Sequence, residues 1–199
     1  ALAGLLHSNG IVMGETKNFI PRPKKKQNAK GFFENYRFRQ INDLVLKQFN
    51  YAIKSYNPNT IPEISGCQIF YIEAYNLLIE YMQKYKTWGW KDPRNCLTLA
   101  FWLDVIKTMG LKENTHILII KRNVEAIARS MKARRNRGSI EKLTLLSKKY
   151  YSFLEKYSVG WDTTTLHFEN LCENPQEEIQ KCPTFIKEKV TDFSFLDKS

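Results

Sequence analysis

The sequence lacks the apolar run of about 20 residues that a membrane-spanning helix needs. It also has no recognisable signal peptide, no internal repeat and no low-complexity tract. Histidine is scarce, and none of His7, His116 and His167 is spaced from a second ligand as in a metal site. We therefore expect no membrane span and no bound metal.

Cysteine pairs of the CxxC type are also missing, although the chain has Cys67, Cys96, Cys172 and Cys182. Four cysteines could form two disulfides, but Cys96 falls at the start of one predicted helix and Cys67 lies in another. We expect free thiols, which are typical of a reducing compartment. With the missing signal peptide, they favour a cytoplasmic protein.

Acidic residues are in deficit, with 20 Asp and Glu against 31 Lys and Arg and a formal net charge of +11. Such an excess attracts anions, although a basic surface that serves only solubility fits the composition equally well. No nucleic-acid-binding motif accompanies the charge, so we do not expect nucleic acid as a partner. The length of 199 residues predicts a single domain over residues 1–199.

Short apolar runs alternate with segments of helical periodicity along the chain. Buried strands are predicted at 116–120 and 164–168, with shorter strands at 11–13 and 87–90. Helices are predicted at about 34–54, 67–85, 96–109, from 123 onward and at 139–157. This alternation predicts a three-layer α/β fold, in which helices flank a mostly parallel sheet.

The first residues, from Ala1 to His7, have the pattern of an apolar helix with no capping residue before it. We expect the natural protein to have a segment upstream of Ala1. Its expected content is a strand and a tight loop that leads into this helix.

Polar residues follow strand 116–120 at the edge of the sheet where ligands of parallel α/β proteins bind. Arg122 comes directly after this strand, and Ser130 lies on the next helix, off its apolar face. A guanidinium can bind a phosphate through two hydrogen bonds, and a serine two turns along can reach the same anion. The simpler alternative is a surface arginine and a surface serine.

The segment Lys91-Asp92-Pro93-Arg94 follows strand 87–90. Pro93 ends the strand, so Lys91 and Arg94 are expected at the same edge of the sheet, where two cations suit an anionic transition state. The alternative is a surface turn with a local ion pair between Asp92 and Arg94, which adds little stability.

Two motifs together resemble the sulfotransferase superfamily. They are Trp88-Gly89-Trp90-Lys91-Asp92-Pro93-Arg94 and Ile119-Ile120-Lys121-Arg122-Asn123-Val124-Glu125-Ala126-Ile127-Ala128-Arg129-Ser130-Met131. The resemblance implies a P-loop-type fold in which Arg122 and Ser130 bind the 3′-phosphate of 3′-phosphoadenosine 5′-phosphosulfate (PAPS). The segment from Phe168 to Pro175 resembles the Tyr-Glu-Asp-Leu…Pro segment of the family, and residues 2–14 look like the helix and turn after its phosphate loop.

A closer likeness connects Gly14-Glu15-Thr16-Lys17-Asn18-Phe19-Ile20-Pro21-Arg22 with the tyrosylprotein sulfotransferases. It implies that Glu15 is the general base and that Lys91 stabilises the transferring sulfuryl group. The segment Gly31-Phe32-Phe33-Glu34-Asn35 resembles bacterial and phage-like members, whose acceptors vary, and makes Glu34 the second candidate for the base. Glu34 could instead form a helix-surface ion pair with Arg37.

The resemblance implies sulfuryl transfer from PAPS to the hydroxyl of a small molecule, sugar or peptide, with 3′,5′-adenosine bisphosphate (PAP) as product and no metal. Lys91 and Arg94 are expected beside Arg122 and Ser130 in the donor site, and segments 16–31 and 55–65 are expected to form the acceptor pocket. The sequence departs from the family at Phe168 and Asn170, and it contains no phosphate-loop motif and no C-terminal Arg-Lys-Gly loop.

Two other functions fit parts of the sequence. A P-loop kinase would use ATP in place of PAPS, but it needs a Gly-Lys-Ser/Thr motif and an Asp for Mg²⁺. A non-catalytic binding module with the same fold would use the basic charge alone.

Overall fold

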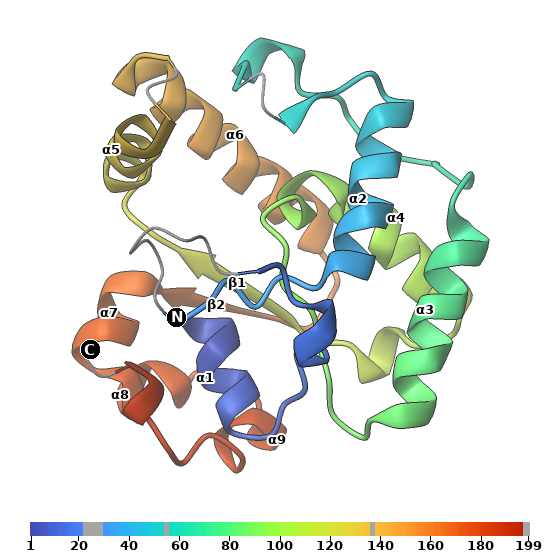
Figure 1. Cartoon of the computed structure of the whole chain (residues 1–199), viewed down its shortest axis with the longest axis vertical. Coiled ribbons are helices and arrows are strands. Elements are labelled where there is room, and N and C mark those ends of the chain that lie inside the picture. Colours follow the sequence, from blue (N-terminus) through green and yellow to red (C-terminus); the bar gives the residue numbers. More distant parts are fainter. Residues whose placement is uncertain (22–29, 54–55, 136–137, 197–199) are drawn as a thin grey trace.

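The computed structural model describes residues 1–21, 30–53, 56–135 and 138–196 (Figure 1). It combines helices with a small parallel sheet, in which β1 (Ile117–Lys121) pairs with β2 (Thr163–His167). Ile120 lies opposite Leu166 in the register, and Lys121 lies opposite His167. Both strands therefore end at the same edge of the sheet. This is the edge at which the sequence predicts ligand-binding residues.

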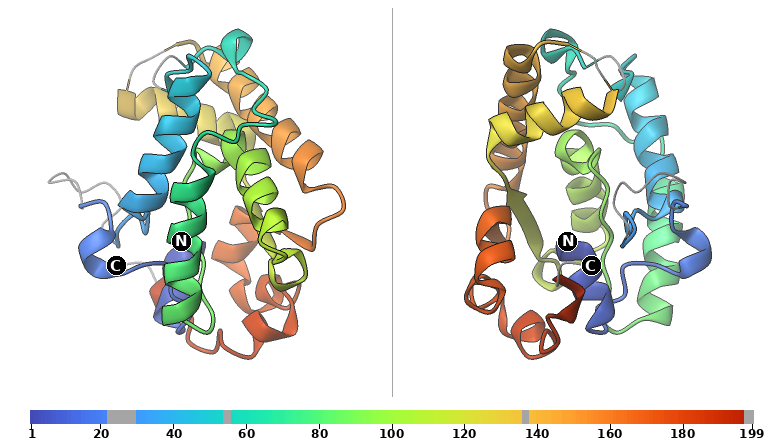
Figure 2. Two further views of the ribbon diagram at one scale, coloured as in Figure 1. Left: turned by 90° about the vertical axis from the view of Figure 1, so that its right-hand side faces the viewer. Right: turned by 60° about the vertical axis from the view of Figure 1, so that its left-hand side comes forward.

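Helices surround this sheet. They are α1 (Leu2–Ser8), α2 (Tyr36–Gln48), α3 (Tyr71–Lys84), α4 (Asn95–Thr108), α5 (Val124–Arg135), α6 (Ile140–Ser158), α7 (Phe168–Glu173), α8 (Pro175–Ile179) and α9 (Thr184–Lys187). In Figure 1, α2, α3 and α4 gather to the right of the sheet, α7 lies to its left, and α1, α8 and α9 lie below it. Figure 2 shows α5 and α6 packed together at the end of the molecule away from α1.

Three apolar clusters hold these groups of helices together, and the smallest, around Leu143, joins α5 to α6. The largest joins α2, α3 and α4, and its aromatic centre has Trp90 stacked on Phe38 with 4.5 Å between the ring centroids. The second cluster joins α1 and the C-terminal helices to Leu166 of β2, which is fully buried. Burial of apolar surface on this scale is the main force that stabilises the fold.

Asparagines set where two of the helices begin. The Oδ1 atom of Asn35 accepts a hydrogen bond from the backbone N–H of Arg37 at 3.0 Å, so α2 starts at Tyr36. Asn123 caps α5 in the same way, because its Oδ1 accepts from the N–H groups of the second and third helical residues. The caps leave the two preceding residues, Glu34 and Arg122, on non-helical backbone next to a fixed helix start.

The prediction of an α/β fold is confirmed as a mixture of helices and parallel strands, but the sheet in the described residues has two strands. The predicted strands 11–13 and 87–90 meet only as an isolated parallel bridge between Val12 and Trp88. Gly14, with a φ of 136°, turns the first segment away, and Pro93 ends the second because it has no N–H to donate. A three-layer P-loop-type fold is therefore not confirmed.

Across the described residues, no helix is long and apolar enough to cross a membrane. The four cysteines are free thiols, as the sequence predicts, and Cys67 and Cys182 are buried. Parts of the expected acceptor pocket, residues 22–29 and residue 55, lie outside the described residues.

Candidate functional site

Arg122 lies directly after β1, at the edge where both strands end. Its guanidinium carbon is 4.6 Å from the centre of the Phe168 ring, and Phe168 begins α7 directly after β2. The backbone N–H of Arg122 donates to the hydroxyl of Tyr151 from α6 at 2.9 Å. A cation held over an aromatic face keeps its charge available to an anion in solution. Phe168, which departs from the tyrosine of the resembled family, thus supports the arginine.

Ser130 lies on α5, the helix that Asn123 caps, and its side chain is partly exposed. It is six residues beyond Val124, the first residue of α5, which corresponds to a rise of about 9 Å along the helix. The structure therefore places Arg122 just before this helix and Ser130 in its second turn, as the sequence predicts.

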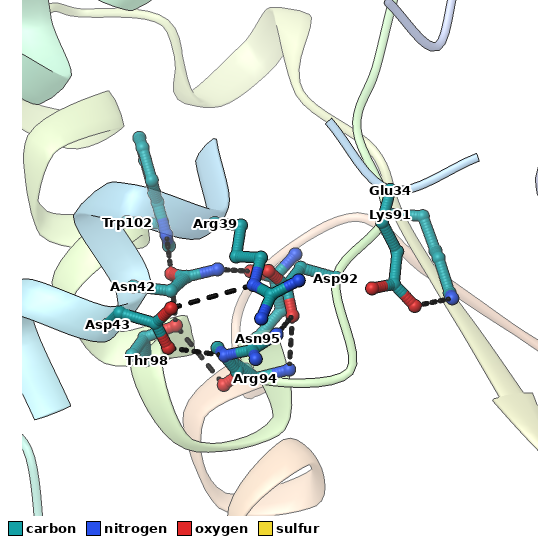
Figure 3. Close-up of polar contacts among 10 residues, drawn as sticks. All are labelled: Glu34, Arg39, Asn42, Asp43, Lys91, Asp92, Arg94, Asn95, Thr98 and Trp102. Carbon is teal, nitrogen blue, oxygen red and sulfur yellow. Dashed lines mark hydrogen bonds and ion pairs between the residues drawn. The ribbon is translucent and has the colours of Figure 1, made fainter. Parts of the chain in front are cut away.

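Lys91 and Glu34 form an ion pair, with 2.7 Å between Nζ and Oε1 (Figure 3). Their backbones are joined by an isolated parallel bridge, so the two side chains leave neighbouring segments at the same level. The Glu34 side chain is 13% exposed and that of Lys91 is 41% exposed, so the carboxylate is the more enclosed partner. Arg37 pairs with Glu80 instead, so the local Glu34–Arg37 pair that the sequence allowed is not formed.

Arg94 binds two carboxylates. Its Nε donates to Asp43 at 2.6 Å and its Nη1 donates to Asp92 at 3.0 Å (Figure 3). The Asp92 side chain is fully buried and that of Arg94 is 12% exposed. Burial alone lowers the pKa of Arg94, but the attraction of Asp92 and Asp43 outweighs it and raises this pKa. In this arrangement Arg94 stabilises the turn after Lys91, rather than presenting a free guanidinium as the donor-site prediction requires.

Asn42 on α2 connects this turn to α4. Its buried Oδ1 accepts hydrogen bonds at 2.7 Å from Thr98 and from Trp102, and its Nδ2 donates to Asn95 at 2.9 Å (Figure 3). Each polar atom of the amide side chain is used, as buried polar groups require. Next to this network, burial and the nearby Asp92 raise the pKa of the Cys96 thiol to about 12, so this cysteine stays protonated at neutral pH.

Glu15 lies with a different set of partners. Its carboxylate contacts Lys84, lies 2.9 Å from Lys17 and accepts a hydrogen bond from the Tyr85 hydroxyl at 3.0 Å. These contacts attach the loop after residue 14 to the C-terminal end of α3. Lys91 thus pairs with Glu34, the second candidate for the base, whereas Glu15 pairs with Lys84 and Lys17.

Glu178 is a site-supporting residue that the sequence analysis missed. Its buried carboxylate accepts hydrogen bonds from the backbone N–H of His167 at 2.5 Å, from Asn170 at 3.2 Å and from Lys181 at 2.5 Å. These bonds connect α8 to the end of β2 and so fix the chain next to Phe168. An acidic residue near a helix start normally indicates only a favourable helix dipole, so no local signal distinguished it.

Replacing Glu178 with glutamine is expected to remove an acid-sensitive part of the stability. Burial alone raises the pKa of Glu178, but the bonds from Lys181, the His167 N–H and Asn170 outweigh it and lower this pKa below its ordinary value. A lowered folded-state pKa stabilises the protein above the unfolded value of about 4.3, and the gain is lost as pH falls through the folded value.

Urea unfolding at pH 7 should show that Glu178→Gln costs about 1–3 kcal/mol. The cost should shrink as the pH is lowered from 5 to 3. Glu177→Gln, at the exposed neighbouring position, is the matched control and should change little. An equal cost at pH 7 and pH 3 would contradict the role given to the ionised carboxylate.

In the described part of the chain, no three His, Cys, Asp or Glu residues are grouped so that they could hold a metal ion. Among the candidate residues, Arg122 follows the end of β1 and lies over the ring of Phe168, and Lys91 and Glu34 form a separate ion pair. Such a set can bind a polyanion and remove a proton.

Comparison with known proteins identifies no relative: no family model, no curated protein and no solved structure matches the chain. A functional assignment therefore depends on the site and on the motifs of the sequence.

Proposed function

We propose that this chain is a sulfotransferase that moves a sulfuryl group from PAPS to an acceptor hydroxyl, in a P-loop-type three-layer α/β fold. The observation that carries the proposal is the ion pair of Lys91 with the enclosed carboxylate of Glu34. It combines a cation for the transferring group with a proton acceptor. The motifs around Lys91 and Arg122 are similar to those of sulfotransferases, and this similarity indicates that PAPS is the donor.

The donor is expected to lie along the strand ends. Arg122 and Ser130 bind the 3′-phosphate, because a guanidinium and a hydroxyl can both donate hydrogen bonds to a phosphate dianion. The guanidinium of Arg122 lies over the ring of Phe168, with its central carbon 4.6 Å from the ring centre. Lys91 then faces the 5′-phosphosulfate and neutralises charge on the oxygens of the sulfuryl group.

The reaction is an in-line displacement at sulfur. The acceptor oxygen forms a new S–O bond while the S–O bond to the 5′-phosphate breaks, and the electron pair of the broken bond stays on the phosphate oxygen of PAP. The hydroxyl proton goes to a carboxylate. As in phosphoryl transfer, the protein accelerates such a step mainly by positioning and by preorganised charge.

Glu34 is the better candidate for the proton acceptor. It contacts Lys91 at 2.7 Å, whereas Glu15 contacts Lys84, Lys17 and Tyr85 at the end of α3. A general base must lie within hydrogen-bonding reach of the hydroxyl that attacks the group held by the cation. We therefore assign the base to Glu34 and the sulfuryl contact to Lys91.

Titration calorimetry of the full gene product with PAP tests the donor site, with ATP and Mg²⁺ as the comparison. We expect PAP to bind more tightly than ATP, and Arg122→Ala to weaken PAP binding by about ten- to a hundredfold, because a charge-assisted contact contributes about 1.5–3 kcal/mol. Arg129→Ala is the matched control, since Arg129 is 72% exposed and pairs with Glu125 on the surface of α5.

The possible outcomes separate the candidate functions. Tighter binding of ATP with Mg²⁺ would identify a kinase. Binding of neither nucleotide would contradict a PAPS-dependent enzyme and leave a binding module. An equal loss in Arg122→Ala and Arg129→Ala would overturn the assignment of the 3′-phosphate site.

A further inference from the structure

The Lys91 ammonium can pair with two anions. One is the Glu34 carboxylate that it contacts, and the other is the sulfonate of a bound donor. Glu34 is 13% exposed, so water compensates its charge only in part, and Lys91 is the cation 2.7 Å away. An enclosed carboxylate that loses its cation carries an uncompensated charge. A proton then becomes the natural substitute for the lost cation.

The backbone on both sides of this pair is held in place. The parallel bridge joins Glu34 to Lys91, and the Asn35 cap fixes the start of α2 directly after Glu34. After Lys91, the backbone N–H of Arg94 donates to Asp92 at 2.8 Å, and the guanidinium binds both Asp92 and Asp43. A change of partner at Lys91 is therefore a movement of its flexible side chain, which is 41% exposed.

We propose that donor binding frees the base: the sulfonate of PAPS takes the ammonium of Lys91 from Glu34, and the released carboxylate then accepts the proton of the acceptor hydroxyl. The inference rests on the proposed function and adds an order of events to it. One cation serves two anions in turn. Until the donor is bound, the ion pair keeps Glu34 neutralised, so deprotonation of an acceptor without a donor is suppressed.

The exchange of partners at Lys91 predicts an effect on donor affinity that would not arise if Glu34 acted only as the base. If Glu34 competes with the donor for Lys91, removing its charge must strengthen donor binding while it removes the proton acceptor. The expected effect is confined to ligands that carry the 5′ anion. Adenosine 3′-monophosphate has only the 3′-phosphate that Arg122 and Ser130 bind, so its affinity should not change.

The test is a titration of the full gene product and its Glu34→Gln variant with PAPS and with adenosine 3′-monophosphate. We expect Glu34→Gln to bind PAPS about fivefold more tightly, the factor that loss of one partly exposed ion pair allows. The affinity for adenosine 3′-monophosphate should stay the same. Glu80→Gln, which breaks the surface pair with Arg37, is the matched control and should change neither affinity. Lys91→Gln provides a second variant, in which PAPS should lose its advantage over adenosine 3′-monophosphate.

Each outcome has one meaning. Failure of the unaltered protein to bind either ligand contradicts the proposed function itself. Binding of both ligands, with PAPS unchanged or weakened in Glu34→Gln, overturns the competition between Glu34 and the donor while the donor site stands. If Glu34→Gln does not fold, as judged by its thermal unfolding, the Lys91→Gln result decides, and an unchanged preference for PAPS overturns the proposal.

Discussion

Replacing Lys91 with methionine is expected to lower the rate of sulfuryl transfer about 1,000-fold, the upper part of the range for loss of one preorganised charge contact in an active site. Methionine keeps much of the length of the side chain but has no charge for the sulfuryl oxygens. The rate is measured as PAP released from PAPS in the presence of a panel of hydroxyl acceptors, with water as the simplest.

The control is Lys47→Met, an exposed lysine in the last turn of α2, which should keep the full rate. Binding of adenosine 3′-monophosphate should survive in Lys91→Met, since that ligand lacks the sulfonate. A rate for Lys91→Met within threefold of the unaltered protein would remove Lys91 from the chemistry.

Replacing Arg94 with methionine is expected to destabilise the protein by about 3–5 kcal/mol, because it leaves the fully buried Asp92 carboxylate without its cation. Breaking a buried ion pair at one partner is among the most destabilising single changes. Urea unfolding at neutral pH measures the loss. The PAP affinity of the folded fraction should be nearly unchanged. This result would distinguish a structural role of Arg94 from the nucleotide-binding role that its position in the sequence suggested.

Two further variants test the cause of this loss. Arg39→Met removes a partly exposed arginine 3.5 Å from the same Asp43 and should cost less than about 1 kcal/mol. Adding Asp92→Asn to Arg94→Met should recover part of the stability, because the amide oxygen still accepts from the backbone N–H of residue 94 and carries no buried charge. No recovery in the double variant would contradict an electrostatic origin.

The local parts of the fold could be predicted from the sequence. The run around Ile119 is short and apolar between polar residues, and it forms β1 within one residue of the predicted bounds. Asn123 at the end of this strand fixes the start of α5, so the positions of Arg122 and Ser130 also followed from local spacing. The helix bounds shifted where a cap was not recognised, as at Asn35, which starts α2 two residues later than predicted.

The long-range pairings could not be predicted. Two segments of similar apolar character, around Val12 and Trp88, were expected in a sheet and form a single bridge, since Gly14 and Pro93 redirect the chain. Glu34 and Lys91 lie far apart in the sequence, and no spacing rule brings them together. A single sequence shows which residues are charged, but it does not show which charges share a partner.

The same limit explains the carboxylate partners of Arg94 and the glutamate that was missed. Arg94 was expected to face a ligand because it follows a strand, but its two carboxylate partners include Asp43 from another helix. Glu178 becomes important only because α8 folds back onto the end of β2. Both residues support the site through contacts that the fold creates.

A crystal structure of the full gene product with PAP is the most direct test of the proposed donor site. We predict that the 3′-phosphate contacts the guanidinium of Arg122 and the hydroxyl of Ser130, and that the 5′-phosphate lies next to Lys91. A nucleotide bound elsewhere, or bound in the reverse direction with its 5′-phosphate at Arg122, would contradict the proposed function and its mechanism.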